Sequence, residues 1–229
     1  MAWHSKRFKV LEKKVERGKK YSIEQAAVIV RETASAKFDE SVDVTLKLGI
    51  DVKRSDQMIR GSVSLPKGSG KTVRVIAFAV GEMAEKAKAA GAMEAGADDL
   101  IKKISDGWTD FDVAVAHPEL MSKVGRLGRV LGPKGLMPSP KAGTVTENVE
   151  RAVKEYLGGR VEYRTDATGC VHALVGKASF KPEDIAENVK AFVEHIAAAR
   201  PSGVKGVFIR KAVLSSTMGP GVEINVAGV

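Results

Sequence analysis

The chain has 229 residues, 44% of them hydrophobic, so it can fill one large core or two ordinary ones without a metal or a disulfide. Its 37 Lys and Arg outnumber its 28 Asp and Glu, and the formal net charge of +9 favours a polyanionic partner, with nucleic acid as the leading class. The single cysteine, Cys170, excludes an internal disulfide. No segment has the roughly 20 apolar residues of a membrane span, and the basic N-terminus lacks the apolar core of a signal peptide. We therefore expect a reduced, cytoplasmic protein with no membrane partner.

The first segment predicts a basic arm followed by a helix. Residues 7–20 hold seven Lys and Arg, Arg17 among them, around a few apolar positions, which is typical of a solvated basic helix or arm. Ser22 and Gln25 have the spacing of a capping box, in which each side chain bonds the other residue's backbone amide. A helix should therefore begin after Ser22 and run to about Thr33.

Two strands and a domain boundary are expected next. Apolar and polar residues alternate over Ser41–Leu48, the period of a half-buried strand, and a second strand should lie near residues 59–65. Pro66–Gly70 has the composition of a loop. After it, Val73–Ala79 is almost continuously apolar, like a strand buried on both faces. We place the first domain boundary at this change of pattern.

The middle segment alternates strands and helices. The patterns predict a helix, a second helix, a strand, a long loop and a closing helix at residues 82–90, 98–105, 111–116, 131–140 and 146–157. Such an order implies a layered sheet with flanking helices. Gly158–Gly159 marks the second boundary.

The last segment resembles the first more than the middle. It predicts strands, a long helix and further strands at residues 160–164, 171–175, 182–199, 206–214 and 222–226. We therefore predict an α/β protein of two domains. Residues 1–67 and 160–229 would form a split α+β domain, and residues 68–159 a three-layer α/β domain inserted into it.

Charge divides unevenly between these expected domains. Residues 1–67 hold 15 basic and 9 acidic side chains, and residues 160–229 hold 9 and 7, so the two ends carry +8. Residues 68–159 hold 13 basic and 12 acidic side chains, so the middle carries +1. The split domain is therefore expected to bind the polyanion.

A phosphate-binding loop is the main alternative, and it would make the protein an NTPase that uses Lys71 and Thr72. Gly68–Thr72 supplies the glycines, the lysine and the hydroxyl of such a loop. The motif also needs a glycine where this chain has Leu65, and a helix where a strand is predicted. The sequence therefore favours a flexible linker, and no enzyme.

Cys170 and His172 point to one face of a predicted strand and could form a metal or nucleophile pair. The other histidines, His4, His117 and His195, lie at no ligand spacing, and no second cysteine exists. A simple core or surface pair is the favoured interpretation, so we expect no metal.

Gly125–Gly135 combines regular glycines with three cations. Its backbone amides and cations could meet RNA phosphates, or the segment could be a surface loop whose glycines make turns. The residues favour the surface loop.

Two further segments suit RNA. Lys37–Ser41 places Phe38 among charged residues before a strand, and Ser215–Gly221 is a hydroxyl-rich turn that contains Met218. Hydroxyls and backbone amides bond ribose and phosphate, while Phe and Met pack on ribose or base faces. Both segments therefore predict contacts to folded RNA.

Seven segments, in order along nearly the whole chain, resemble the bacterial ribosomal protein L-one family. They are Ala36–Glu40, Leu48–Asp51, Arg54–Gln57, Gly61–Pro66, Leu127–Pro138, Gly176–Phe180 and Ser216–Pro220. The resemblance implies the same split and inserted domains. It also implies a hinge made of Pro66, Lys67, Gly68, Gly158 and Gly159.

The resemblance further implies a structural constituent of the large ribosomal subunit, a monomer when free, without a cofactor. Such proteins bind ribosomal RNA of the mobile stalk near the tRNA exit site. They also repress translation by binding their own mRNA, and exit-site tRNA is a further partner. The implied RNA contacts, by matching motif, are Lys37, Phe38, Lys47, Arg164, Asp166, Thr168, His172, Ser216, Thr217, Met218 and Gly219.

Overall fold

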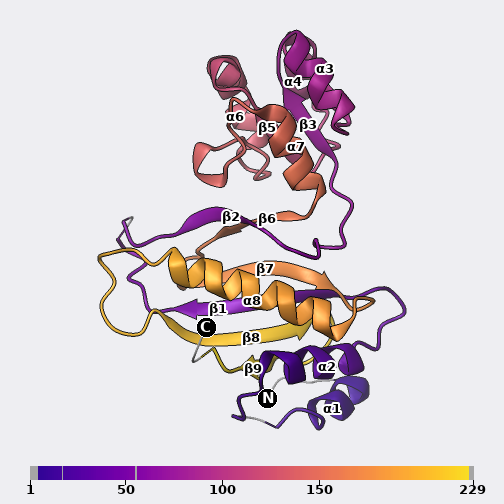
Figure 1. Ribbon diagram of the computed structural model, residues 1–229, viewed down its shortest axis with the longest axis vertical. Coiled ribbons are helices and arrows are strands. Elements are labelled where there is room, and N and C mark those ends of the chain that lie inside the picture. The colour runs from indigo at the N-terminus through magenta and orange to yellow at the C-terminus, as the bar shows by residue number, and fades with distance from the viewer. Residues whose placement is uncertain (1–4, 17, 55, 227–229) are drawn as a thin grey trace. The chain divides into compact units, whose positions relative to one another are not determined.

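The computed structural model describes residues 5–16, 18–54 and 56–226 (Figure 1). Arg17 of the expected basic arm, Ser55 of the Arg54–Gln57 motif and both chain ends lie outside the described residues. The expected mixed α/β class is confirmed. Contacts divide the chain into a split unit, Met1–Gly70 with Val161–Val229, and an inserted unit, Lys71–Arg160.

The split unit contains three helices and two sheets among its described residues. The helices are α1 (Lys6–Glu12), α2 (Ile23–Thr33) and α8 (Pro182–Ala198). The strands are β1 (Ser41–Leu48), β2 (Arg60–Ser64), β6 (Arg160–Arg164), β7 (Cys170–Lys177), β8 (Ile209–Ser216) and β9 (Val222–Ile224). An antiparallel sheet has the order β7-β1-β8-β9, and β2 pairs with β6 in a second sheet.

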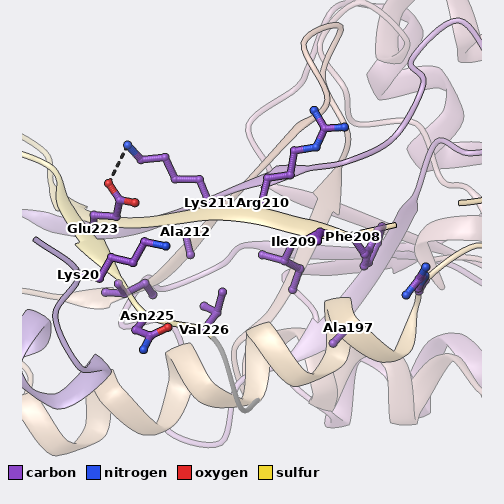
Figure 2. Close-up of a pocket in the computed structure, with 13 residues that line it drawn as sticks. Lys20, Ala197, Phe208, Ile209, Arg210, Lys211, Ala212, Glu223, Asn225 and Val226 are labelled. Carbon is purple, nitrogen blue, oxygen red and sulfur yellow. Dashed lines mark ion pairs between the residues drawn. The ribbon is translucent and has the colours of Figure 1, made fainter. Parts of the chain in front are cut away.

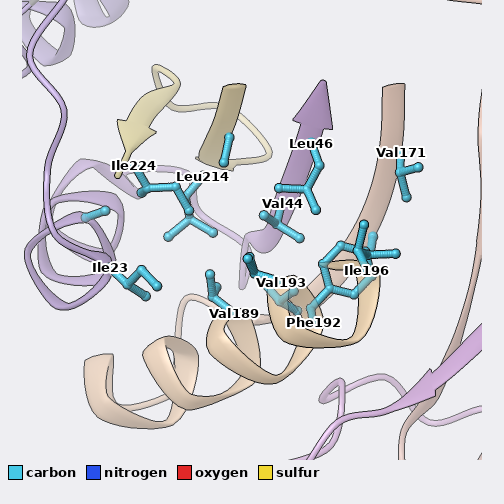
Figure 3. Close-up of a cluster of buried hydrophobic side chains, with 14 of the residues drawn as sticks. Ile23, Val44, Leu46, Val171, Val189, Phe192, Val193, Ile196, Leu214 and Ile224 are labelled. Atoms are coloured by element: carbon cyan, nitrogen blue, oxygen red, sulfur yellow. The ribbon is translucent and has the colours of Figure 1, made fainter. Parts of the chain in front are cut away.

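The core of the split unit lies between one face of the large sheet and helices α2 and α8 (Figure 1). In β1 every second residue is buried, from Val42 to Leu48, as the alternation predicts. Figure 3 shows Val44 and Leu214 of the sheet facing Val189 of α8. The predicted capping box is also confirmed, with Ser22 Oγ accepting the Gln25 N–H at 3.2 Å.

The inserted unit is built on a parallel sheet of order β4-β3-β5. Its strands are β3 (Val75–Phe78), β4 (Glu94–Gly96) and β5 (Val113–Ala116). Its α-helices are α3 (Glu82–Ala89), α4 (Asp98–Ser105), α5 (Met121–Val124), α6 (Gly128–Leu131) and α7 (Val149–Leu157), and its 3-10 turns are η1 (Pro118–Leu120), η2 (Gly125–Leu127) and η3 (Pro140–Ala142).

Apolar clusters cover both faces of this parallel sheet. Ile76 and Phe78 pack with residues of α4 to α6, such as Ile104, while Val75 packs with α3 and α7, including Tyr156. All four residues of β3 are buried, as its continuous apolar run predicts. The sheet is therefore enclosed between two helical layers.

The segment from Gly125 to Leu131 differs from the prediction. It forms η2 and α6 instead of a surface loop. Leu127 and Leu131 are buried, and this burial outweighs the low helix propensity of the glycines. A Cβ on Gly132 would lie 2.5 Å from the carbonyl oxygen of Gly128, so close backbone packing requires that glycine.

Candidate nucleic-acid interface

Four of the expected contact residues meet at the Lys47 end of β1. The Asp166 carboxylate accepts the backbone N–H groups of Thr168, at 2.8 Å, and Cys170, at 2.7 Å. Lys47 Nζ donates to the Thr168 carbonyl. His172 Nε2 lies 3.5 Å from Asp166 Oδ2. The turn between β6 and β7 is thereby bonded to itself and to β1.

Asp166 serves this turn as an acceptor. The Cys170 N–H, followed by the Thr168 hydroxyl, lowers the pKa of Asp166 to about 2. The carboxylate therefore stays ionised at neutral pH and would repel a phosphate. Asp166 lies in the candidate surface because it holds the turn between β6 and β7 together.

Arg164 lies apart from this group, at the end of β6 in the two-stranded sheet. Its side chain is exposed, whereas the next residue, Thr165, is buried and accepts the Ile59 N–H at 3.2 Å. Arg164 is therefore available as a cation.

The other expected contacts meet at the Ser41 end of β1. The backbone N–H of Thr217 donates to the Ser41 carbonyl at 3.0 Å, which places the turn after β8 beside β1. Lys37 is exposed. Phe38 and Met218 are 55% and 47% exposed, so two large apolar side chains are open to solvent, and Lys37 directly precedes Phe38 in the chain. Such residues suit packing on bases and ribose.

Ser216 has a different role from the one expected. It faces the core, is 4% exposed, and its hydroxyl is buried, so the hydroxyl is not open to RNA. A Cβ on Gly219 would lie 2.4 Å from this hydroxyl. The Ser216 side chain therefore has a packing role that requires glycine at position 219, and the expected contact is corrected for its hydroxyl.

Two residues that the sequence did not indicate lie between these ends. Asp43 and Thr45 lie on the same face of β1 as Lys47, opposite the helices. Thr45 Oγ1 and His172 Nδ1 are 3.1 Å apart. Burial raises the pKa of Asp43. Ser41 and Lys47 are six residues apart, about 20 Å along the strand, so the candidate surface spans about that length.

A basic hollow of about 410 Å³ lies elsewhere on the split unit (Figure 2). Its cations include Lys20, Arg200 and Arg210, while Lys211 Nζ pairs with Glu223 at 2.8 Å. The hollow therefore adds to the positive surface of this unit.

The expected hinge segment near Pro66 is bonded to α8. Asn188 is fully buried; its amide donates to the carbonyls of Gly68, at 2.9 Å, and Val175, at 2.7 Å, and its oxygen accepts the Lys67 N–H at 3.0 Å. These bonds hold the segment to the split unit.

At the second boundary Gly158 caps α7 and donates to the Lys154 carbonyl at 2.9 Å. Gly159 follows at φ +101°, a backbone conformation that favours glycine. The two glycines therefore end the helix and redirect the chain into β6.

The phosphate-loop alternative is not supported. Strand β3 follows Gly68–Thr72 where the motif needs a helix, and Lys71 Nζ pairs with Asp112 at 2.9 Å. Among the residues described, no group of three or more His, Cys, Asp or Glu could hold a metal ion. The described helices include none that is long and apolar enough to cross a membrane.

The fold and the surface define a basic, mixed α/β protein whose candidate site is one exposed face of a sheet. Residues 30–220 match the Ribosomal protein L1p/L10e family. The chain is 53% identical over 228 residues to the large ribosomal subunit protein uL1 of Thermosipho melanesiensis, covering 99% of this chain and 98% of that one. It is also 53% identical over 226 residues to uL1 of Thermus thermophilus, with 98% and 99% covered. The chain belongs to the ribosomal protein L1p/L10e family.

Proposed function

We propose that the chain is a structural constituent of the large ribosomal subunit and binds ribosomal RNA of the mobile stalk near the tRNA exit site. The names of its relatives support a place in the large ribosomal subunit. The family is one of structural, non-catalytic proteins. The observation that carries RNA binding is the pair Phe38 and Met218, both exposed in the chain's more basic unit on two segments that Glu40 bonds together. The split unit holds 23 basic and 16 acidic residues, against 14 and 12 in the inserted unit.

Affinity and specificity come from different groups in this proposal. Lys37, Lys47 and Arg164 attract phosphates, and salt weakens that attraction. Phe38 and Met218 pack on unstacked bases or ribose, which selects a folded shape. An RNA duplex without unstacked bases would bind only to the three cations.

The same surface would bind the protein's own mRNA and repress its translation, because an RNA that folds like the stalk presents the same shape. The inserted unit would contact exit-site tRNA. The free protein would be a cytoplasmic monomer. These proposals rest on the family resemblance.

A binding assay tests the function. The purified protein is titrated against a stalk ribosomal RNA fragment and against a hairpin of equal length and shuffled sequence, with the leader of its own mRNA as competitor. We expect tight binding to the fragment, weak binding to the hairpin, and competition by the leader. Equal affinity for fragment and hairpin would contradict shape recognition. Nucleotide hydrolysis lost on Lys71→Ala would instead support the NTPase alternative.

A further inference from the structure

Two side chains of opposite charge join the same two segments of the proposed RNA surface. Arg7 of α1 donates to Ser35 Oγ at 2.8 Å and to the Met218 carbonyl at 3.2 Å. The Glu40 carboxylate accepts the Ala36 N–H at 2.8 Å and the Met218 N–H at 3.0 Å. Both backbone polar groups of Met218 are therefore held, one by each charge.

Glu40 is 1% exposed, an unusual place for a carboxylate beside a polyanion-binding surface. Burial raises its pKa, but the Ala36 and Met218 N–H groups and further donors outweigh that effect and lower it. The ionised group would repel phosphate, so attraction of RNA does not explain it. The two backbone bonds of Glu40 explain its burial, because each fixes a segment that carries an exposed apolar side chain.

The segment before β1 is also held from its other side. Asp39 accepts the Ser179 N–H at 3.1 Å and the Ser179 hydroxyl at 2.9 Å. Phe38 thus lies in the chain between two bonded positions, Ala36, whose N–H Glu40 accepts, and Asp39, which accepts from Ser179. The exposed ring projects from a braced segment, and RNA binding need not order that segment.

We propose that Glu40 and Arg7 are positioning residues for RNA recognition, tying the Ser35–Phe38 segment to the Met218 turn before RNA arrives. The inference rests on the proposed function. It also makes α1 part of the binding device, because α1 supplies Arg7 and is anchored by the buried side chain of Leu11. A braced surface loses less conformational entropy on binding than a flexible one.

The test uses Glu40→Gln and Arg7→Gln in the full chain. Glutamine keeps the shape of Glu40 but can accept only one of the two N–H groups, because its NH₂ is a donor. Glu32→Gln on α2 and Lys9→Gln on α1, both exposed, are the matched controls. Affinity for the stalk fragment is measured across a salt series, and amide hydrogen exchange is measured without RNA.

We expect both variants to bind the fragment roughly 10- to 100-fold more weakly, with an unchanged slope of log affinity against log salt. The Met218 amide should exchange faster in Glu40→Gln, and the controls should keep normal affinity and exchange. If Glu40→Gln fails to fold, Arg7→Gln decides, because Arg7 is exposed.

Three results would overturn the proposal. Normal affinity in a folded Glu40→Gln or Arg7→Gln removes the positioning role. A lower salt slope in Arg7→Gln makes that residue a phosphate contact instead. If the unmodified protein itself shows no preference for the fragment, the proposed function is wrong. That failure is distinguishable from failure of the positioning role, because it appears without any substitution.

Discussion

The Thr217 hydroxyl accepts the Ser41 N–H at 3.0 Å and lies 3.2 Å from the carbonyl of the same residue, to which it donates. The Thr217 N–H reaches that carbonyl as well, at 3.0 Å. The hydroxyl therefore fastens the turn after β8 to β1 and is not a free donor. An RNA group could reach only its remaining lone pair.

Thr217→Val tests this attachment. Valine has nearly the same volume but leaves the Ser41 N–H without its partner, so the turn should loosen and RNA binding should weaken by about 1 to 3 kcal/mol. The loss should be alike at all salt concentrations, and Thr217→Ser should retain the affinity. Dissociation constants measured across a salt series test this prediction. Wild-type affinity in the valine variant would show that this turn does not take part in RNA recognition.

Replacing Lys37 and Lys47 with Gln separates charge from shape. Each lost phosphate contact should flatten the slope of log affinity against log salt by up to about one unit. Lys181 and Lys190, exposed at the start of α8 and along it, provide a double-Gln control with the same charge change. An unchanged slope in the first variant would place Lys37 and Lys47 outside the interface.

Local signals in the sequence were sufficient for much of the fold. The capping box at Ser22 and the alternation of β1 depend only on neighbouring residues. Strand β4, at Glu94–Gly96, was missed because three small or charged residues show no period, and it exists through pairing with β3. The helical turns at Gly125–Leu131 were missed because tertiary burial decided them.

The candidate site was less predictable because its bonds cross the whole chain. Residue types and the family resemblance indicate Phe38 and Met218. The burial of Ser216 depends on its register with Val42, 174 positions away. The contact from Arg7 to Met218 spans 211 positions. No local pattern contains such pairings, so the positioning residues emerged only from the structure.

Asn188→Ala should destabilise the split unit. It leaves the Lys67 N–H and the carbonyls of Gly68 and Val175 without their buried partner, at a cost of about 2 to 4 kcal/mol. Denaturant unfolding measures the loss. Glu194→Ala, on an exposed position of α8, should change stability little. Equal stability of the two variants would show that the hinge segment is not anchored as described.

The inserted unit leaves and rejoins the split unit at adjacent strands. The Thr165 N–H donates to the Ile59 carbonyl at 3.0 Å, so the start of β2 lies beside the end of β6 and the two strands run antiparallel. The end of β2, near Ser64, therefore lies close to the start of β6, near Arg160. A short linker can join the chain there.

A chain that joins residues 1–70 through a few glycines to residues 161–229 should fold and keep most of the specific RNA affinity. Loop-closure cost grows only with the logarithm of loop length, so removing residues 71–160 should not penalise the split unit. Those residues enclose their own sheet and should fold alone, binding RNA weakly and without discrimination. The cations for that weak binding are Arg126, Arg129, Lys134 and Lys141. Circular dichroism and competition with an unrelated structured RNA measure both outcomes. Unfolded joined ends would contradict the domain boundaries, and specific affinity in the isolated insert would contradict the placement of the binding site.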